Sequence, residues 1–289
     1  NTAVGSHGVV GGGQSNQAWL AYSTVSGGFQ NAAYYMSAVA GGKLNRAFGS
    51  YGAIGGGVAG FVYGYCGAVG GGHHNTAHGD WSAIAGGRYN LLQHWSAVGG
   101  GQYNSAYGQY ATISGGSTNL NYGYGGTVGG GFGNTVLTSN SSVIAGGNNN
   151  MANADWGSIA GGRGNAVNAT GGAVGGGQYN TVLSYAGVVS GGHSNTATGV
   201  YSAVAGGQAN TAQGWGAIAG GQLNFAYVWS SVCGGYRNKG FGYAVSIGGG
   251  SHNNAYSTWS TIGGGFNNVL YGGYATIGGG HSHKVYGTY

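Results

Sequence analysis

The chain of 289 residues contains 73 Gly, no Pro and 3% charged residues, which is far from the composition of an ordinary globular domain. Disordered chains are poor in hydrophobic residues and rich in charge, whereas 41% of this chain is hydrophobic and 13% aromatic, so we expect it to be ordered. Glu is absent and the only acids are Asp80 and Asp155, so paired-carboxylate chemistry, including polysaccharide cleavage, has almost nothing to work with. We therefore expect no enzyme activity and no catalytic residues.

The chain is dominated by one internal repeat. Residues 1–9 fall outside its regular phase and are expected to form an irregular N-terminal segment. From Val10 to Ile277, a Val or Ile followed by a small residue and Gly-Gly recurs nineteen times, at intervals of about fifteen residues. Such a unit is too short for two helices, and Gly-Gly in every unit opposes helix formation. The sequence predicts an all-β fold, a parallel β-solenoid (a β-roll or β-helix) of about nineteen coils of fifteen residues, as a single continuous domain over residues 10–289.

Each coil is expected to contain two short strands separated by turns. The stretch 201–204 (Tyr-Ser-Ala-Val) alternates, which predicts a strand with Ser202 and Val204 facing inward. Gly206 and Gly207 then supply the backbone freedom that a tight corner needs. A second, shorter strand carries a recurrent Asn and an apolar residue.

The recurrent Asn lies six residues after the Val or Ile and is present in 17 of the nineteen coils. We expect its side chain to face inward, because stacked amides can hydrogen-bond from coil to coil as a ladder. The predicted structural ladder comprises Asn16, Asn31, Asn45, Asn75, Asn90, Asn104, Asn119, Asn134, Asn150, Asn165, Asn180, Asn195, Asn210, Asn224, Asn238, Asn253 and Asn268.

An outward aromatic column is the most informative predicted surface feature. The residue three before the next Val or Ile is aromatic in eleven of eighteen coils: Tyr22, Tyr51, Trp81, Trp95, Tyr110, Trp156, Tyr201, Trp215, Trp229, Trp259 and Tyr274. Such a column would be a large apolar patch on a monomer, so we expect another chain to cover it. The alternative is a ligand-binding solenoid, with a glycan-stacking or host-binding strip or an ice-binding surface. Ice binding is disfavoured, because the neighbouring outward place holds Thr in only five coils.

The recurring Ser-Ala-Val/Ile-x-Gly-Gly-x-x-Asn-x-Ala-x-Gly, clearest at residues 202–214 and 82–90, resembles the YadA-like head repeat of trimeric autotransporter adhesins. The resemblance covers residues 10–289. It implies a left-handed β-roll, three chains packed side by side, and a bacterial surface protein that adheres to host matrix or to other cells. This chain departs from the family in its fifteen-residue unit and near absence of charge.

The charged residues give little sign of a ligand site. All seven cations follow the Gly-Gly pair at places five to eight of the coil, where places are counted from the Val or Ile. We expect these cationic side chains to lie at solvent-exposed corners of the coils. They are spaced too widely to form a phosphate site and are too scattered along the chain to bind nucleic acid. His73, His74 and His78 lie near Asp80, but this set lacks the ligand spacing of structural zinc sites, so no metal and no cofactor are predicted.

Cys66 and Cys233 lie twelve coils apart, nearly 60 Å at about 4.8 Å per coil, which excludes a disulfide within the chain. No apolar run is long enough to span a membrane. The last coil carries no cap, which predicts that something else covers it. We expect an extracellular or cell-surface structural or adhesive protein. Its expected partners are itself, as a homotrimer or filament, and host-matrix, cell-surface or glycan ligands.

Overall fold

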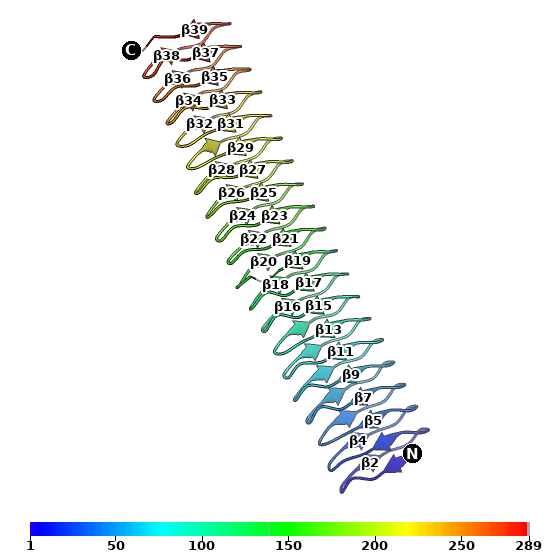
Figure 1. Cartoon of the computed structure of the whole chain (residues 1–289). Coiled ribbons are helices and arrows are strands. Elements are labelled where there is room, and N and C mark those ends of the chain that lie inside the picture. Colours follow the sequence, from blue (N-terminus) through cyan, green and yellow to red (C-terminus); the bar gives the residue numbers. More distant parts are fainter. Residues whose placement is uncertain (138, 288–289) are drawn as a thin grey trace. The chain divides into compact units, whose positions relative to one another are not determined.

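The structure, a computed structural model, describes residues 1–137 and 139–287, and this part of the chain contains strands and no helix. The predicted fold class is confirmed, because two parallel sheets stack as a β-solenoid of about 19 turns of about 15 residues (Figure 1). The chain divides into two compact units, Asn1–Gly147 and Asn148–Tyr289, and each is described by itself. Left-handedness and continuity over residues 10–289 stay predictions.

In the first unit, odd-numbered strands form sheet A and even-numbered strands form sheet B, and each strand pairs in parallel with the next one of its sheet. Sheet A contains β1 (Thr2–Ala3), β3 (Gln17–Ala18), β5 (Ala32–Ala33), β7 (Arg46–Ala47), β9 (Phe61–Val62), β11 (Thr76–Ala77), β13 (Leu91–Leu92), β15 (Ser105–Ala106), β17 (Leu120–Asn121) and β19 (Thr135–Val136). Sheet B contains β2 (Val9–Val10), β4 (Thr24–Val25), β6 (Ala38–Val39), β8 (Ala53–Ile54), β10 (Ala68–Val69), β12 (Ala83–Ile84), β14 (Ala97–Val98), β16 (Thr112–Ile113), β18 (Thr127–Val128) and β20 (Val143–Ile144).

The second unit repeats this arrangement. Its sheet A strands are β21 (Met151–Ala152), β23 (Ala166–Val167), β25 (Thr181–Val182), β27 (Thr196–Ala197), β29 (Thr211–Ala212), β31 (Phe225–Ala226), β33 (Lys239–Gly240), β35 (Asn254–Ala255), β37 (Val269–Leu270) and β39 (Lys284–Val285). Its sheet B strands are β22 (Ser158–Ile159), β24 (Ala173–Val174), β26 (Val188–Val189), β28 (Ala203–Val204), β30 (Ala217–Ile218), β32 (Ser231–Val232), β34 (Ser246–Ile247), β36 (Thr261–Ile262) and β38 (Thr276–Ile277).

The N-terminal segment is not irregular, which corrects the expectation for residues 1–9. Thr2–Ala3 pairs in parallel with Gln17–Ala18. The Asn1 side chain already acts as a rung, because its Oδ1 accepts the backbone N–H of Asn16 at 3.0 Å. The signal was present in the sequence, since Asn1 and Asn16 are one repeat apart.

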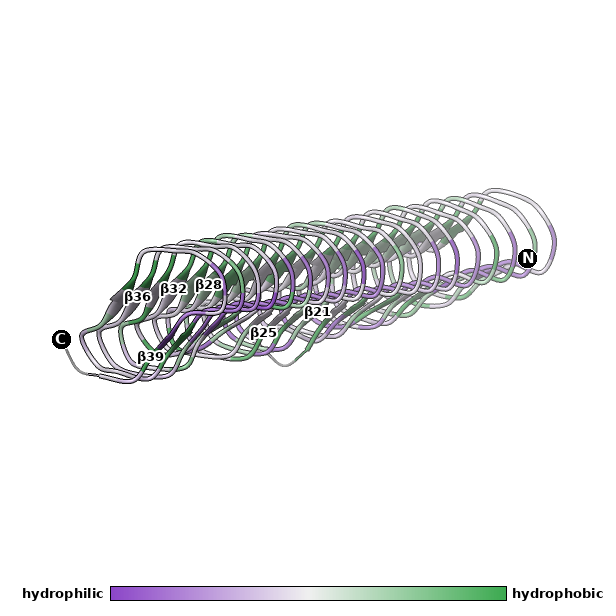
Figure 2. Ribbon diagram, turned by 90° about the horizontal axis from the view of Figure 1, so that it is seen from above, coloured by the Kyte–Doolittle hydropathy of each residue, from purple (hydrophilic) through white to green (hydrophobic). Residues whose placement is uncertain are grey.

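Each strand is only two residues long, shorter than the predicted stretch 201–204. Ala203–Val204 is the strand, and Tyr201 lies in the preceding turn with φ of 53°. The predicted directions hold, because Ser202 and Val204 are buried while Tyr201 and Ala203 are exposed. A Gly-Gly edge leads from sheet B to sheet A, and a turn edge leads back to sheet B, so each coil is a flat loop (Figure 2).

The core between the sheets is thin, and the same repeat positions pack against each other in every coil. Val or Ile of sheet B faces mostly Ala or Val of sheet A, and these side chains are buried. The two coils that lack an apolar residue in sheet A are compensated. Gly240 leaves room for the buried Val245, and the Asn121 amide donates to the carbonyls of Thr112 and Gly126. The core thus keeps its volume and its polar groups keep their partners.

The seventeen recurrent Asn side chains face inward and are buried, as the sequence predicts, and their bonds run mainly to the backbone. Asn195 is representative: its Nδ2 donates to Gly191 O and to Gly207 O of the next coil, both at 2.9 Å. Its Oδ1 accepts the backbone N–H of Asn210 at 3.0 Å. Amide-to-amide bonds occur beside these, as when Asn90 Nδ2 donates to Asn75 Oδ1 and Asn119 Nδ2 to Asn104 Oδ1, both at 3.2 Å. The expected ladder of amide-to-amide bonds is therefore corrected: the amides mainly close their own Gly-Gly corners and fasten the next coil.

Gly60 interrupts this ladder in the first unit. Its N–H donates to Asn45 Oδ1 at 2.8 Å, but without a side chain it offers no acceptor to the N–H of Asn75 in the next coil. In the second unit the ladder runs unbroken from Asn150, and at its far end the N–H of His283 donates to Asn268 Oδ1 at 3.0 Å.

The two glycines of each corner predict opposite responses to substitution. Gly207 has φ of 87°, and a Cβ there would overlap the carbonyl oxygen of Gly221 and approach Asn210 Nδ2 at 2.7 Å. A Cβ on Gly206 would meet no atom within 4 Å. We expect Gly207→Ala to destabilise by at least about 2 kcal/mol, from left-handed strain plus overlap, and Gly206→Ala by less than about 1 kcal/mol. Thermal melts followed by circular dichroism test this, and equal melting temperatures would contradict it.

Gly60→Asn is expected to stabilise the chain by about 1 to 2 kcal/mol, because it supplies the missing acceptor to Asn75 and lowers the entropy of the unfolded chain. Gly60→Ala is the matched control, since it changes the backbone entropy without adding a rung. Denaturant unfolding of the three proteins separates the two effects. If Asn is no more stabilising than Ala, the ladder contributes nothing at this coil.

Candidate functional site

The eleven aromatic residues predicted to form an outward column lie on the turn edge, and all are exposed. Each has a positive φ, between 53° for Tyr201 and 60° for Tyr110. This left-handed conformation costs a non-Gly residue about 1 kcal/mol or more. Neighbouring coils hold it, as when the N–H of Trp215 donates to the carbonyl of Val200 at 2.8 Å. The turn conformation directs the rings away from the core.

Gaps in the column are filled by the preceding residue, a pattern that the sequence analysis missed. Where the column holds Met, Cys, Gly or Ala, the residue before it is Tyr in five coils: Tyr35, Tyr65, Tyr124, Tyr185 and Tyr243. Ser141 and Gly171 are the remaining gaps and have no such neighbour. We name the column and these five Tyr residues together the aromatic edge. Nearly every coil therefore places one ring there, which core packing does not require.

Rings of the aromatic edge form continuous contacts within each unit. In the first unit the run is Tyr51, Tyr65, Trp81, Trp95, Tyr110 and Tyr124, with centroid separations between 5.4 and 5.8 Å. In the second unit it is Tyr185, Tyr201, Trp215, Trp229, Tyr243 and Trp259, with separations between 4.4 and 6.4 Å. Four of the five substituting Tyr residues are members of these runs.

Ring orientation distinguishes the aromatic edge from a second ring row at place ten. Place-ten rings lie face to face, as in Phe241, Tyr256, Tyr271 and Tyr286, with interplanar angles of 10°, 6° and 8°. Their faces cover one another. The aromatic edge instead mixes stacked pairs, such as Trp215 and Trp229 at 10°, with edge-on pairs, at 76° for Tyr51 and Tyr65 and 90° for Tyr185 and Tyr201. In an edge-on pair only the edge of one ring meets the face of the other, so more ring face stays open to a partner than in a stacked pair.

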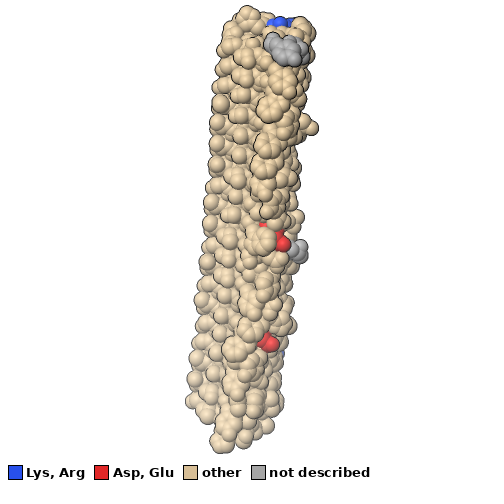
Figure 3. Space-filling view, turned by 90° about the vertical axis from the view of Figure 1, so that its left-hand side faces the viewer, with Lys and Arg blue, Asp and Glu red and all other residues tan. Residues whose placement is uncertain are grey.

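The aromatic edge carries little charge. Desolvation, with Cys66 and Tyr51 nearby, raises the pKa of the Tyr65 phenol, so this ring stays neutral at physiological pH. Asp80 is engaged by its neighbours: its Oδ1 accepts the N–H of Tyr65 at 2.7 Å, and His94 Nδ1 lies 4.0 Å from its Oδ2. The face of the molecule drawn in Figure 3 shows few charged side chains.

His73, His74 and His78 do not converge on Asp80. The His74 ring stacks on Tyr89 at 4.9 Å, and His78 stacks on Tyr63 at 4.7 Å. Across residues 1–137 and 139–287, no three His, Cys, Asp or Glu side chains come together in a way that could hold a metal ion. Cys66 and Cys233 are both free thiols. The described part of the chain contains no helix that is long and apolar enough to cross a membrane.

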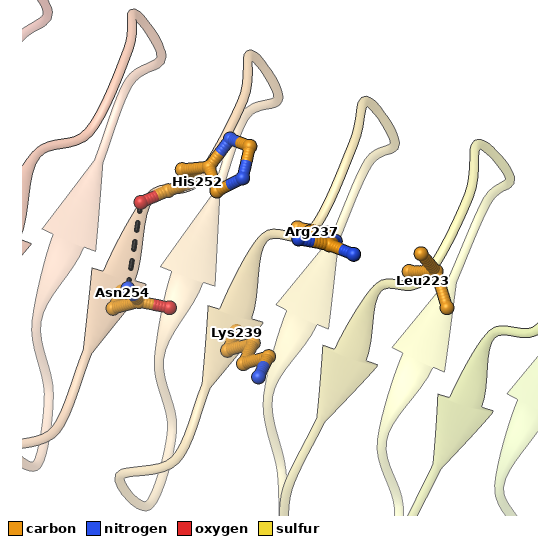
Figure 4. Close-up of a pocket in the computed structure, with 5 residues that line it drawn as sticks. All are labelled: Leu223, Arg237, Lys239, His252 and Asn254. Atoms are coloured by element: carbon orange, nitrogen blue, oxygen red, sulfur yellow. Dashed lines mark hydrogen bonds between the residues drawn. The ribbon is translucent and has the colours of Figure 1, made fainter.

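A basic groove in the second unit brings together residues that the sequence analysis treated as separate corners. It has a volume of about 390 Å³ and is lined by Leu223, Arg237, Lys239, His252 and Asn254. Figure 4 shows Leu223, Arg237 and His252 in a row beside the turns, with Lys239 on β33 and Asn254 on β35. Arg237 and Lys239 lie in one coil, and coil stacking sets His252 and Asn254 of the next coil, fifteen residues further on, beside them.

A smaller groove lies at equivalent places in the first unit. It has a volume of about 230 Å³ and is lined by Ser15, Gln17, Gln30, Ala32, Leu44 and Arg46. Its only cation is Arg46. The sequence signal for both grooves is the pairing of places six and eight in successive coils, which becomes visible only once the repeat is aligned coil by coil.

No protein-family model and no curated protein matches this chain. The resemblance of the repeat to the YadA-like head therefore stays a prediction.

One prediction concerns the substitution of Tyr for missing column rings. Tyr243→Ala removes the ring between Trp229 and Trp259 and should cost about 1 kcal/mol, since two exposed ring pairs are lost. Adding Ala244→Trp, which places a ring on the column itself, should restore stability and the exciton signal of coupled rings in circular dichroism. Failure of the double variant to recover that signal would show that the two places are not equivalent.

Proposed function

We propose that this chain is an extracellular structural or adhesive repeat protein that self-associates through its aromatic edge into a trimer or filament. The observation that carries the proposal is the row of exposed rings, present in nearly every coil, whose edge-on pairs leave ring face open. Contiguous apolar surface of this kind is a common mark of a protein interface, and interfaces are enriched in Tyr and Trp.

A second copy of the chain suits this surface because its rings repeat with the same coil spacing, about 4.8 Å. Rings of one edge can then insert between, or stack on, rings of another along many coils. The low charge of both edges removes the repulsion that would oppose contact. The trimeric form and the cell-surface location rest on the resemblance of the repeat, whereas a filament needs only the ring row.

The test compares two triple variants by sedimentation velocity and electron microscopy. The first variant replaces Trp81, Trp156 and Trp259 with Ser and so removes three rings from the aromatic edge. It should give dispersed chains with an unchanged circular dichroism spectrum. The second variant is the control and replaces Tyr103, Tyr179 and Phe266 with Ser. It removes three rings of similar exposure near the Gly-Gly edge and should leave the assembly intact.

Two results would overturn the proposal. One is a monomeric unmodified protein at high concentration, with Trp fluorescence typical of water-exposed rings. The other is dissociation by the Gly-Gly-edge variant alone. A monomer that retains open ring faces would favour the alternative, a ligand-binding strip.

A further inference from the structure

The basic groove gathers positive charge that no acid of the chain neutralises. Residues 156–289 contain no Asp or Glu, and Asp155 lies at place twelve, on the turn edge. Arg237 and Lys239 make no ion pair among the described residues. They are held instead by rings: the Arg237 guanidinium lies 5.1 Å from the Tyr236 centroid, and Lys239 Nζ lies 5.9 Å from that of Phe241. Such contacts position a cation without occupying its N–H donors.

His252 adds a third nitrogen group to the same groove. Its Nδ1 lies 2.8 Å from Ser251 Oγ, which leaves Nε2 for a ligand. The three nitrogen-bearing side chains come from two successive coils and line the same groove (Figure 4). Cationic and imidazole N–H donors that line one groove can recognise a carboxylate or another oxyanion.

Asn254, which also lines this groove, carries a hydrogen-bond acceptor that has no donor. Its Nδ2 donates to the carbonyl of His252 at 3.4 Å, the bond drawn in Figure 4. Its Oδ1 is buried and has no hydrogen-bond partner, the one such side-chain atom found in the described part of the chain. A buried acceptor without a donor is costly, so a turn of the Asn254 amide that brings Oδ1 into the groove, where a ligand hydroxyl can donate to it, is favourable.

We propose that the basic groove binds an acidic saccharide, with its carboxylate held by Arg237, Lys239 and His252 and a neighbouring hydroxyl donating to Asn254 Oδ1. A sugar acid carries both groups on one ring, whereas simple anions lack the hydroxyl. Three nitrogen groups at one place are too few for nucleic acid, which is held by many phosphate contacts along its backbone. This site is separate from the aromatic edge and does not depend on self-association.

The full chain is titrated calorimetrically with galacturonate, tri-galacturonate and the neutral trisaccharide of galactose. We expect the trisaccharide acid to bind and the neutral sugar to show no heat. Comparison with the monomeric acid distinguishes a polysaccharide segment from a single sugar acid as the ligand. The double variant Arg237→Gln with Lys239→Gln should weaken binding by about 10-fold or more, because both charge-assisted contacts are lost.

Arg88→Gln with Arg163→Gln is the matched control, since it removes the same charge from cations outside the groove; Arg46→Gln tests the smaller groove. The groove variant and these two control variants should all retain the circular dichroism spectrum of the unmodified protein. The two control variants should also retain its affinity for tri-galacturonate. Asn254→Ala should weaken galacturonate but leave inorganic sulfate unaffected, because only the sugar offers a hydroxyl donor.

The proposal fails if the Arg88 and Arg163 variant loses as much affinity as the groove variant, which would indicate diffuse electrostatic attraction. It also fails if sulfate or a DNA oligonucleotide displaces tri-galacturonate at equal concentration, or if no acid binds at all. Sedimentation of the groove variant should match that of the unmodified protein, which separates this test from that of self-association.

Discussion

The solenoid depends on one repeated arrangement, an inward Asn whose amide joins two Gly-Gly corners and one backbone N–H. Asn195 shows it: the amide donates within its own coil to Gly191, donates to Gly207 of the next coil, and accepts from Asn210. A corner built from glycines has exposed carbonyls and high chain entropy, so it needs an internal partner to become rigid. Asn is the smallest side chain that can donate the two hydrogen bonds and accept the one that this corner requires. The Gly is equally constrained, because any Cβ at Gly207 would overlap the next coil.

This arrangement also decides what can lie outside. Since each strand has two residues and the core admits mainly Val, Ile, Ala and Ser, the large side chains have no room inside. They collect on the surface in columns, because every coil repeats the last. A periodic interior therefore produces periodic rows of rings on the outside, and their function depends on orientation. Rings that stack face to face satisfy one another, whereas rings set edge-on leave surface for a partner.

The same stacking creates the grooves. A place that is unremarkable within one coil becomes half of a site when the next coil sets its equivalent beside it. Arg237 and His252 are fifteen residues apart and line one groove, and Lys239 and Asn254 are related in the same way. A repeat protein can thus vary its surface by single substitutions at exposed places while the Asn and Gly columns keep the fold unchanged.

The sequence by itself determined the period, the parallel solenoid, the inward Val or Ile and the inward Asn, because these follow from the regular recurrence of glycine and of small apolar side chains. It also placed the aromatic column outside. The tertiary structure decided the partners of each group. It showed that the Asn amides bond mainly to backbone, that Asn1 is a rung of the ladder, that Tyr243 and its equivalents complete the aromatic edge, and that Arg237, Lys239 and His252 line one groove. These facts depend on which residues of successive coils lie side by side and on the turn conformations that aim them. Spacing along a chain gives the period of such contacts but not their direction.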